Sequence, residues 1–273
     1  MDDLTVAEAI KLKAVLTNDD EEQLEVPLTY HNRTNEILPP EKSLVQKQLS
    51  EISKYAEENE MKVNIKKTKV MLFNTAKKHD FTPALKIDNE ILEVTDEMKL
   101  LGVKISDDLK WNSNTKYITS RAYSRLWILR RLKNLGANQS ELIDCYIKQA
   151  RSILEYCAVV WHAGLTQINT LDIERVQKAA CSIILGKHYA GYQDALLRLG
   201  LERLDTRREG LSSRFAKKAL KSTKYSSWFV PDANLPNTRR NVKSVKVAQC
   251  RTRRLEKSAL PFLTKILNIN DKN

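Results

Sequence analysis

The sequence predicts an α+β protein built from two unlike halves. Up to Trp111, apolar residues alternate with polar ones or form short runs, which is typical of short β-strands. After Trp111 they recur at every third or fourth position, which is typical of helices. The charge changes at the same place. Residues 1–111 carry 16 Lys and Arg against 22 Asp and Glu, a net charge of −6, whereas residues 112–273 carry 30 against 12, a net charge of +18.

The first half is expected to form one helix and a small, mostly antiparallel sheet. The helix covers about residues 41–60, and its apolar residues recur at helical spacing at Leu44, Leu49, Ile52 and Ala56. The strands are expected at residues 61–65, 70–73, 85–87, 91–94 and 100–105. The first two would form a hairpin, and Asp88-Asn89 would be a turn between the next two. The last would be a single buried strand that joins the two halves, with a bend at Gly102.

The second half is expected to be helical. Its helices are predicted near residues 113–135, 140–161, 170–185, 192–199 and 205–220. Their expected N-terminal caps are Asn112 or Ser113, Ser140, Asn169 or Thr170, and Asp205. Glycines stand where the helices should stop, at Gly136, Gly164, Gly186 and Gly200. The apolar faces of the first three helices, with Leu171 among the inward residues, imply a bundle. The predicted domains are therefore residues 1–111, 112–200 and 201–273.

Several classes of protein are excluded by composition. The four cysteines (Cys145, Cys157, Cys181 and Cys250) form no Cys-x-x-Cys pair, so neither a zinc site nor a disulfide framework is expected. The apolar run Cys157–Trp161 is far shorter than the roughly 20 residues that span a bilayer. The acidic start at Met1 is unlike a secretory signal. A protein of a reduced intracellular compartment, nuclear or cytoplasmic, is the expectation.

The positive second half predicts a polyanionic partner, with nucleic acid favoured over a merely solvated basic surface. Two groups of basic residues are the candidates for phosphate binding. The first group lies on the helix that follows Trp111 and consists of Arg121, Arg125, Arg130 and Arg131. The second lies in a basic tail and consists of Arg239, Arg240, Lys243, Arg251, Arg253 and Arg254. Asp2-Asp3 is a possible Mg²⁺ site, although such a pair is also common in an acidic terminus.

Five motifs, in this order, resemble the C-terminal part of jockey-like non-LTR retrotransposon reverse transcriptases. They are Met61–Phe73, Leu101–Ile105, Ala122–Lys133, Arg151–His162 and Ile173–Ala180. Asp2-Asp3 falls where that family has its Asp-Asp pair, with Met1 in the position before it. The resemblance implies the end of a polymerase palm, followed by an all-α thumb and a basic tail.

The same resemblance implies roles for individual residues. Asp2 and Asp3 would be the catalytic Mg²⁺ ligands of an RNA-directed DNA polymerase, and Lys67 would lie near the nucleotide phosphates. Leu101, Gly102 and Val103 would form the primer grip. The family's fingers and first catalytic Asp have no counterpart in this sequence, so the chain alone is expected to be inactive.

Three alternatives stay open at this level. The chain is an enzyme fragment, a nonspecific RNA- or DNA-binding module without catalysis, or a relic without a role. Salt-dependent binding with little sequence preference would favour the second. The partners expected by family are an RNA template, a DNA primer or their hybrid, and no membrane is expected.

Overall fold

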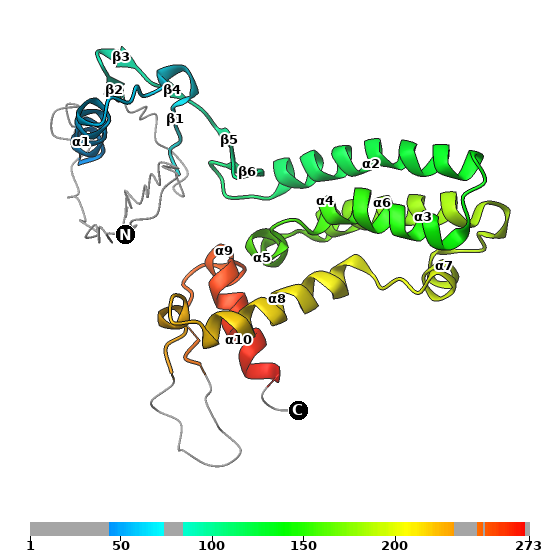
Figure 1. The fold of residues 1–273 in the computed structure, drawn as a ribbon. Coiled ribbons are helices and arrows are strands. Elements are labelled where there is room, and N and C mark those ends of the chain that lie inside the picture. The colour runs from blue at the N-terminus through cyan, green and yellow to red at the C-terminus, as the bar shows by residue number, and fades with distance from the viewer. Residues whose placement is uncertain (1–43, 74–83, 232–244, 248, 271–273) are drawn as a thin grey trace. The chain divides into compact units, whose positions relative to one another are not determined.

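The computed structural model describes residues 44–73, 84–231, 245–247 and 249–270. These residues are mostly helical, with three pairs of short strands, so the α+β class is confirmed. The chain divides into two compact units. One comprises residues up to Met98 together with Ser106–Leu109, and the other comprises Lys99–Ile105 and Lys110–Asn273. Most of the strands belong to the first unit and most of the helices to the second (Figure 1).

Helix α1 (Leu44–Glu58) organises the first unit, as the sequence predicted. It packs over an apolar cluster made of Val45, Leu49, Val70, Leu85, Ile87 and Leu92. Gln46 fastens the helix to the backbone of Lys86, since an amide side chain can both donate and accept. Its oxygen accepts from the N–H of Lys86 at 2.9 Å, and its nitrogen donates to the carbonyl of Lys86 at 2.8 Å.

The hairpin expected at residues 61–73 is wrong. Ile65–Lys67 forms a short 3-10 turn, η2, in which the side chain of Asn64 accepts from the N–H of Lys67 at 3.2 Å. This local bond takes a backbone donor that a strand would have offered to its partner. After the turn, β1 (Lys69–Val70) pairs in parallel with β4 (Glu93–Val94) instead.

The turn expected at Asp88-Asn89 is confirmed. It joins β2 (Lys86–Ile87) to β3 (Glu90–Ile91) in an antiparallel pair. Asp88 and Asn89 have φ values of 49° and 64°. Two successive residues with positive φ match the twist of the flanking strands, and Asp and Asn tolerate this conformation better than most residues.

The single strand expected at residues 100–105 is wrong, because the chain reverses within it. β5 (Glu97–Leu100) and β6 (Val103–Ser106) form a hairpin around the turn Leu101-Gly102, whose φ values are 45° and 86°. Leu101 is 71% exposed, whereas Val103 is buried. A run of apolar residues predicts a strand that is buried on both faces, and it gives no indication of a reversal. The only residue in the run that indicated a change of direction was Gly102.

Helix α2 (Asn112–Asn134) begins the second unit, close to its predicted bounds. It buries Ile118, Ala122, Leu126 and Leu129, and it packs along α6 (Gln167–Leu185). Gly136 follows its end with φ 89°, as expected for a helix stop. The predicted caps are wrong: the helix begins after Trp111 without a side-chain cap, and Asn112 instead accepts from the amide of Asn169 at 2.9 Å.

The next predicted helix, residues 140–161, is not continuous. Its parts are α3 (Gln139–Tyr146), the π turn η3 (Ile147–Arg151), α4 (Ser152–Glu155) and α5 (Ala158–Trp161). Asn138, not Ser140, caps it, in a capping box with Glu141. The chain breaks at Cys157, which has φ 51°. Trp161 holds the break by donating its indole N–H to the carbonyl of Tyr156 at 3.0 Å.

Two of the later helices, α6 and α8 (Leu204–Lys221), start earlier than predicted, whereas the helix predicted at residues 192–199 has both of its predicted ends. Thr166, rather than Asn169 or Thr170, caps α6, and Leu171 is 54% exposed rather than inward. The helices end before Gly186 and Gly200 as expected, the second of these being α7 (Tyr192–Leu199). Helix α8 starts before the predicted cap Asp205, which lies inside its first turn.

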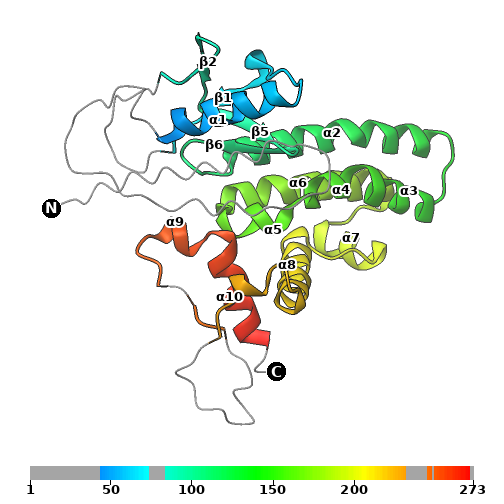
Figure 2. The ribbon, with the colours of Figure 1, turned by 60° about the vertical axis from the view of Figure 1, so that its left-hand side comes forward.

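The C-terminal elements add a second apolar cluster to this unit. Helix α9 (Arg253–Glu256) contains the last two arginines of the basic tail, and α10 (Ala259–Asn270) follows it and packs against α8. The buried members of the cluster are Ala216, Ala219, Phe229, Val245, Leu263 and Leu267. Figures 1 and 2 show α8 and α10 on the side of α6 that faces away from α2. Among the described helices, none is long and apolar enough to cross a membrane.

Candidate nucleic-acid interface

Helix α2 carries six basic residues and no acidic residue. One of them, Lys133, is used inside the unit, because its ammonium donates to the carbonyls of Ile183 and Ile184 at the end of α6. A cation is favoured there by the helix dipole. The other five are exposed: Lys116, Arg121, Arg125, Arg130 and Arg131. The exposed face of α2 is therefore strongly positive.

These five side chains differ from several arginines elsewhere in the second unit. Those arginines are paired with carboxylates, as in Arg175–Asp172, Arg198–Asp194, Arg203–Asp205 and Arg207–Glu155. Within the described part of the chain, none of the five on α2 forms an ion pair. Their positive field is therefore directed at solvent and at any anion that approaches.

The four arginines predicted from the sequence share this helix but not one line along it. Arg121 lies one turn beyond Tyr117, and Arg125 lies one turn beyond Arg121. Arg130 and Arg131 lie one turn beyond Trp127 and on either side of it. At 100° per residue, Arg125 and Arg130 are roughly 140° apart around the helix. The surface consists of two basic groups, one next to the β5–β6 hairpin and one around an exposed indole.

The group next to the hairpin centres on the ring of Tyr117. The ammonium groups of Lys99 and Lys104 lie 5.1 and 5.8 Å from the ring centre, and the guanidinium of Arg121 lies 5.4 Å from it. Arg121 also donates to the Tyr117 hydroxyl at 3.1 Å. Hydrogen bonding by Lys99, with the charge of Arg121, lowers the pKa of the Tyr117 phenol below its ordinary value. Three cations thus converge on one aromatic ring, named below the Tyr117 cluster.

Lys99, Lys104 and Tyr117 were not among the site residues predicted from the sequence. A two-residue turn at Leu101-Gly102 places Lys99 and Lys104 opposite each other across the hairpin. Like charges in that arrangement repel each other. A turn predicted at Leu101-Gly102 would have indicated that Lys99 and Lys104 are neighbours, but one continuous strand was predicted there.

Tyr156 holds the predicted primer-grip residues. Its hydroxyl donates to the carbonyl of Leu101 at 2.8 Å. A methyl group added at Gly102 would lie 3.1 Å from the Tyr156 ring, so only glycine lets the turn approach this closely. Val103, the third residue, points into the core of the helical unit. The break at Cys157 positions Tyr156 here, and no sequence pattern indicated it.

The remaining predicted site residues lie elsewhere. Lys67 is exposed on η2 in the first unit. Arg251, Arg253 and Arg254 are exposed at the start of α9, where Thr252 caps the helix. Five predicted residues lie outside the described residues: Asp2, Asp3, Arg239, Arg240 and Lys243.

The predicted Mg²⁺ site has no counterpart in the part of the chain that the structure describes. Those residues contain no group of three or more His, Cys, Asp and Glu side chains that could hold a metal ion. The expected ligands, Asp2 and Asp3, are outside them. Mg²⁺ binding therefore stays a prediction of the family resemblance.

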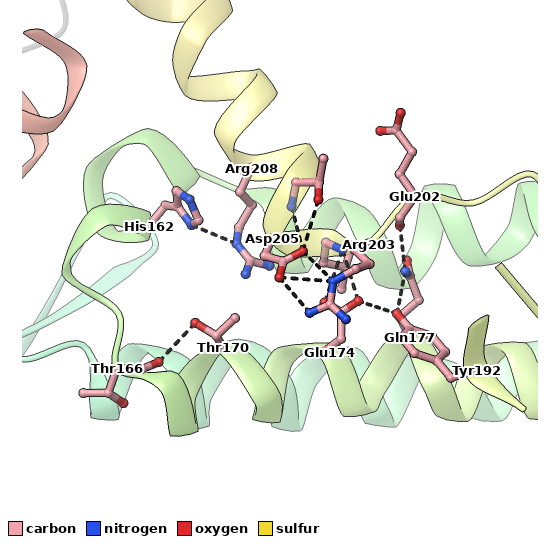
Figure 3. A network of polar contacts seen from close by, with 12 residues as sticks. His162, Thr166, Thr170, Glu174, Gln177, Tyr192, Glu202, Arg203, Asp205 and Arg208 are labelled. Carbon is pink, nitrogen blue, oxygen red and sulfur yellow. Dashed lines mark hydrogen bonds and ion pairs between the residues drawn. The ribbon is translucent and has the colours of Figure 1, made fainter. Parts of the chain in front are cut away.

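A buried polar network joins the helices beneath this surface (Figure 3). The Glu174 carboxylate accepts from the Tyr192 hydroxyl and from the N–H of Leu204. Gln177 accepts from the Tyr146 hydroxyl at 2.7 Å and donates to that of Tyr192 at 2.9 Å. Because these buried groups satisfy one another, the network fixes α3, α6, α7 and the start of α8 in one arrangement.

Arg208 lies in the same region with fewer partners. Its side chain is fully buried, its guanidinium lies 5.7 Å from the Trp161 ring centre, and its Nε donates to Nδ1 of His162 at 3.3 Å. Its two terminal nitrogens have no hydrogen-bond partner among the described residues. Burial lowers the pKa of this guanidinium. Figure 3 shows this contact between Arg208 and His162.

His162 makes the stability of this unit depend on pH. Burial, and secondarily the charge of Arg208, lower its pKa from 6.5 to about 4, while Asp205 opposes the shift. The unfolded chain then binds a proton near pH 6.5 that the folded chain does not bind until about pH 4. Stability should thus be fully present above pH 6.5 and fall by up to about 3 kcal/mol as the pH drops to 4.

Urea unfolding between pH 4 and 7 checks this expectation. His162→Gln keeps an acceptor for Arg208 but cannot titrate. Carboxylates titrate in the same range in both proteins, so the difference between the two pH profiles isolates His162. Parallel profiles would contradict the assignment.

Comparisons with protein-family models, with curated proteins and with solved structures found no match for this chain. Its resemblance to reverse transcriptases therefore rests on its sequence motifs alone.

Proposed function

We propose that this chain binds nucleic acid through the phosphate backbone, without preference for base sequence. The exposed face of α2 carries the proposal, because its five basic side chains have no carboxylate partner among the described residues. Lysine and arginine side chains that neutralise phosphates supply affinity but do not read bases.

The length of the surface favours a polymer over a small anion. From Lys116 to Arg131 the helix rises by about 22 Å, at 1.5 Å per residue. A nucleic-acid strand presents several phosphates over that distance, whereas a single phosphate would meet only one or two of the side chains. The Tyr117 cluster extends the positive surface onto the adjacent hairpin.

The sequence resemblance supports a wider proposal, in which the helical unit is the thumb of a retrotransposon reverse transcriptase. The observation that favours it is the turn Leu101-Gly102, which Tyr156 holds next to the Tyr117 cluster. Such a turn could hold the end of a primer strand while the cations contact its phosphates. RNA-directed DNA synthesis would require Asp2, Asp3 and Mg²⁺, and it is proposed on the resemblance only.

Fluorescence anisotropy with labelled oligonucleotides of random sequence tests the binding proposal. With about five phosphate contacts, the logarithm of the affinity should fall with the logarithm of the salt concentration at a slope of roughly 3.5 to 4.5. Raising the salt from 50 to 200 mM should then weaken binding roughly 100- to 500-fold. Oligonucleotides of equal length and different sequence should bind alike. Affinity that does not respond to salt would overturn the proposal.

A further inference from the structure

Two large aromatic side chains stand on the exposed face of α2 without partners. Trp127 is 62% exposed and Tyr123 is 42% exposed. Within the described residues, neither ring makes an aromatic or cation–π contact, and the Tyr123 hydroxyl makes no hydrogen bond. A single exposed apolar residue is ordinary, but two large aromatic rings without partners on one face form a patch that indicates a contact with another molecule.

The other exposed aromatic residues of the helical unit are accounted for within it. Tyr156 donates its hydroxyl to the hairpin turn, and Trp228 packs against Tyr225 with ring centres 4.8 Å apart. Tyr123 and Trp127 therefore differ from them in having no structural use in the part of the chain that is described.

The two rings share one line of the helix. They are four residues apart, which places their Cβ atoms about 6 Å from each other on the same face. Arg130 and Arg131 lie one turn beyond Trp127, and Lys116 lies about two turns before Tyr123. Aromatic faces bounded at both ends by cations match a strand whose bases are exposed and whose phosphates lie beside them.

We infer that Tyr123 and Trp127 are stacking platforms for nucleobases, so that α2 takes unpaired nucleic acid in preference to duplex. This inference rests on the proposed function and names its substrate class. In a duplex the faces of the bases are covered by their neighbours, and a ring on a helix surface cannot reach them. In a single strand they are free, and stacking on a side chain needs no particular base.

The positive charge around the two rings argues against an apolar protein segment as the molecule bound there. The face that carries the two rings has no acidic residue, and the basic residues around it form no ion pairs among the described residues. An apolar partner would have to bury those charges without a counter-ion, whereas a nucleic-acid strand supplies one phosphate for every base that it stacks.

The test compares Trp127→Ala and Tyr123→Ala with the wild type in binding a labelled 20-nucleotide single strand and a hairpin duplex of the same composition. Each substitution should weaken single-strand binding roughly 5- to 100-fold and leave the salt slope unchanged, because stacking releases no counter-ions. Duplex binding should change less than twofold. Trp127→Phe should retain most of the single-strand affinity. Trp228→Ala, which removes an exposed indole elsewhere, is the matched control and should have no effect.

The outcomes separate this inference from the function on which it rests. If binding depends on salt but Trp127→Ala and Tyr123→Ala do not weaken it, the stacking role is overturned and the proposed phosphate contacts are retained. An equal loss on single strand and duplex would overturn the preference for unpaired bases. If the wild type binds neither nucleic acid, the proposed function and the inference both fail.

Discussion

Replacing Arg121, Arg125, Arg130 and Arg131 together by alanine should weaken nucleic-acid binding roughly 100-fold at 0.15 M salt and lower the salt slope by about 3. Each arginine that neutralises a phosphate releases a condensed counter-ion, and the gain from that release is lost with the side chain. All four side chains are exposed and form no ion pairs among the described residues, so their removal should leave the fold unchanged. Anisotropy titrations at three salt concentrations, with a thermal melt of each protein, measure both quantities.

A matched pair of double variants separates the α2 surface from net charge. Arg130→Ala/Arg131→Ala and Arg175→Ala/Arg198→Ala each remove two positive charges from exposed helix positions. Arg175 and Arg198 are already paired with Asp172 and Asp194, on α6 and α7. Only the first pair should lower the slope, by about 1.5. Equal effects would mean that the overall charge of the protein, rather than α2, attracts the nucleic acid.

Trp161→Ala should lower the free energy of unfolding of the helical unit by about 3 to 5 kcal/mol. Trp161 is fully buried, its indole N–H binds the carbonyl of Tyr156 at 3.0 Å, and Arg208 lies over its ring. Alanine would leave a large cavity and free the carbonyl that fixes the break in the helix. Urea unfolding followed by circular dichroism gives the change directly.

Two further substitutions provide the comparison for the stability loss in Trp161→Ala. Trp161→Phe fills most of the cavity but lacks the N–H donor, so it should destabilise the unit by an intermediate amount. Trp228→Ala removes a half-exposed indole and should cost much less. If Trp161→Ala were no more harmful than Trp228→Ala, the ring would not be a core residue. Because Tyr156 supports the Leu101 turn, Trp161→Ala should also weaken nucleic-acid binding more than its stability effect alone explains.

The helices and their ends followed largely from local sequence. The apolar spacing in Ile118, Ala122, Leu126 and Leu129 specifies one buried face whatever packs on it, and these residues are indeed buried. Gly136, Gly186 and Gly200 follow helix ends as predicted, because a positive φ after a helix costs glycine less than any other residue. Gly164 does not have this role, since α5 ends at Trp161 and Gly164 lies in the 3-10 turn that follows. Caps were predicted less well, since Asn, Ser and Thr occur close together at each helix start and the choice among them depends on the preceding loop.

The candidate site divides in the same way. The basic character of α2, with Arg121, Arg125, Arg130 and Arg131, was visible in the sequence, because charge and helical spacing are local properties. The Tyr117 cluster was not visible, because Lys99 and Lys104 meet Tyr117 only after the chain reverses at Gly102. That reversal, and Tyr156 which holds it, depend on a backbone break at Cys157 that the packing of Trp161 stabilises.

The sequence by itself determined that this is an α+β chain with a helical, strongly basic second part, since periodicity and charge are read residue by residue. Only the tertiary structure decided which cations are free and which are used. Lys133 and Arg208 look like their neighbours in the sequence, yet one caps α6 and the other is buried beside Trp161. A side chain's availability depends on the carboxylates, carbonyls and rings that distant segments bring to it, and local patterns do not encode those contacts.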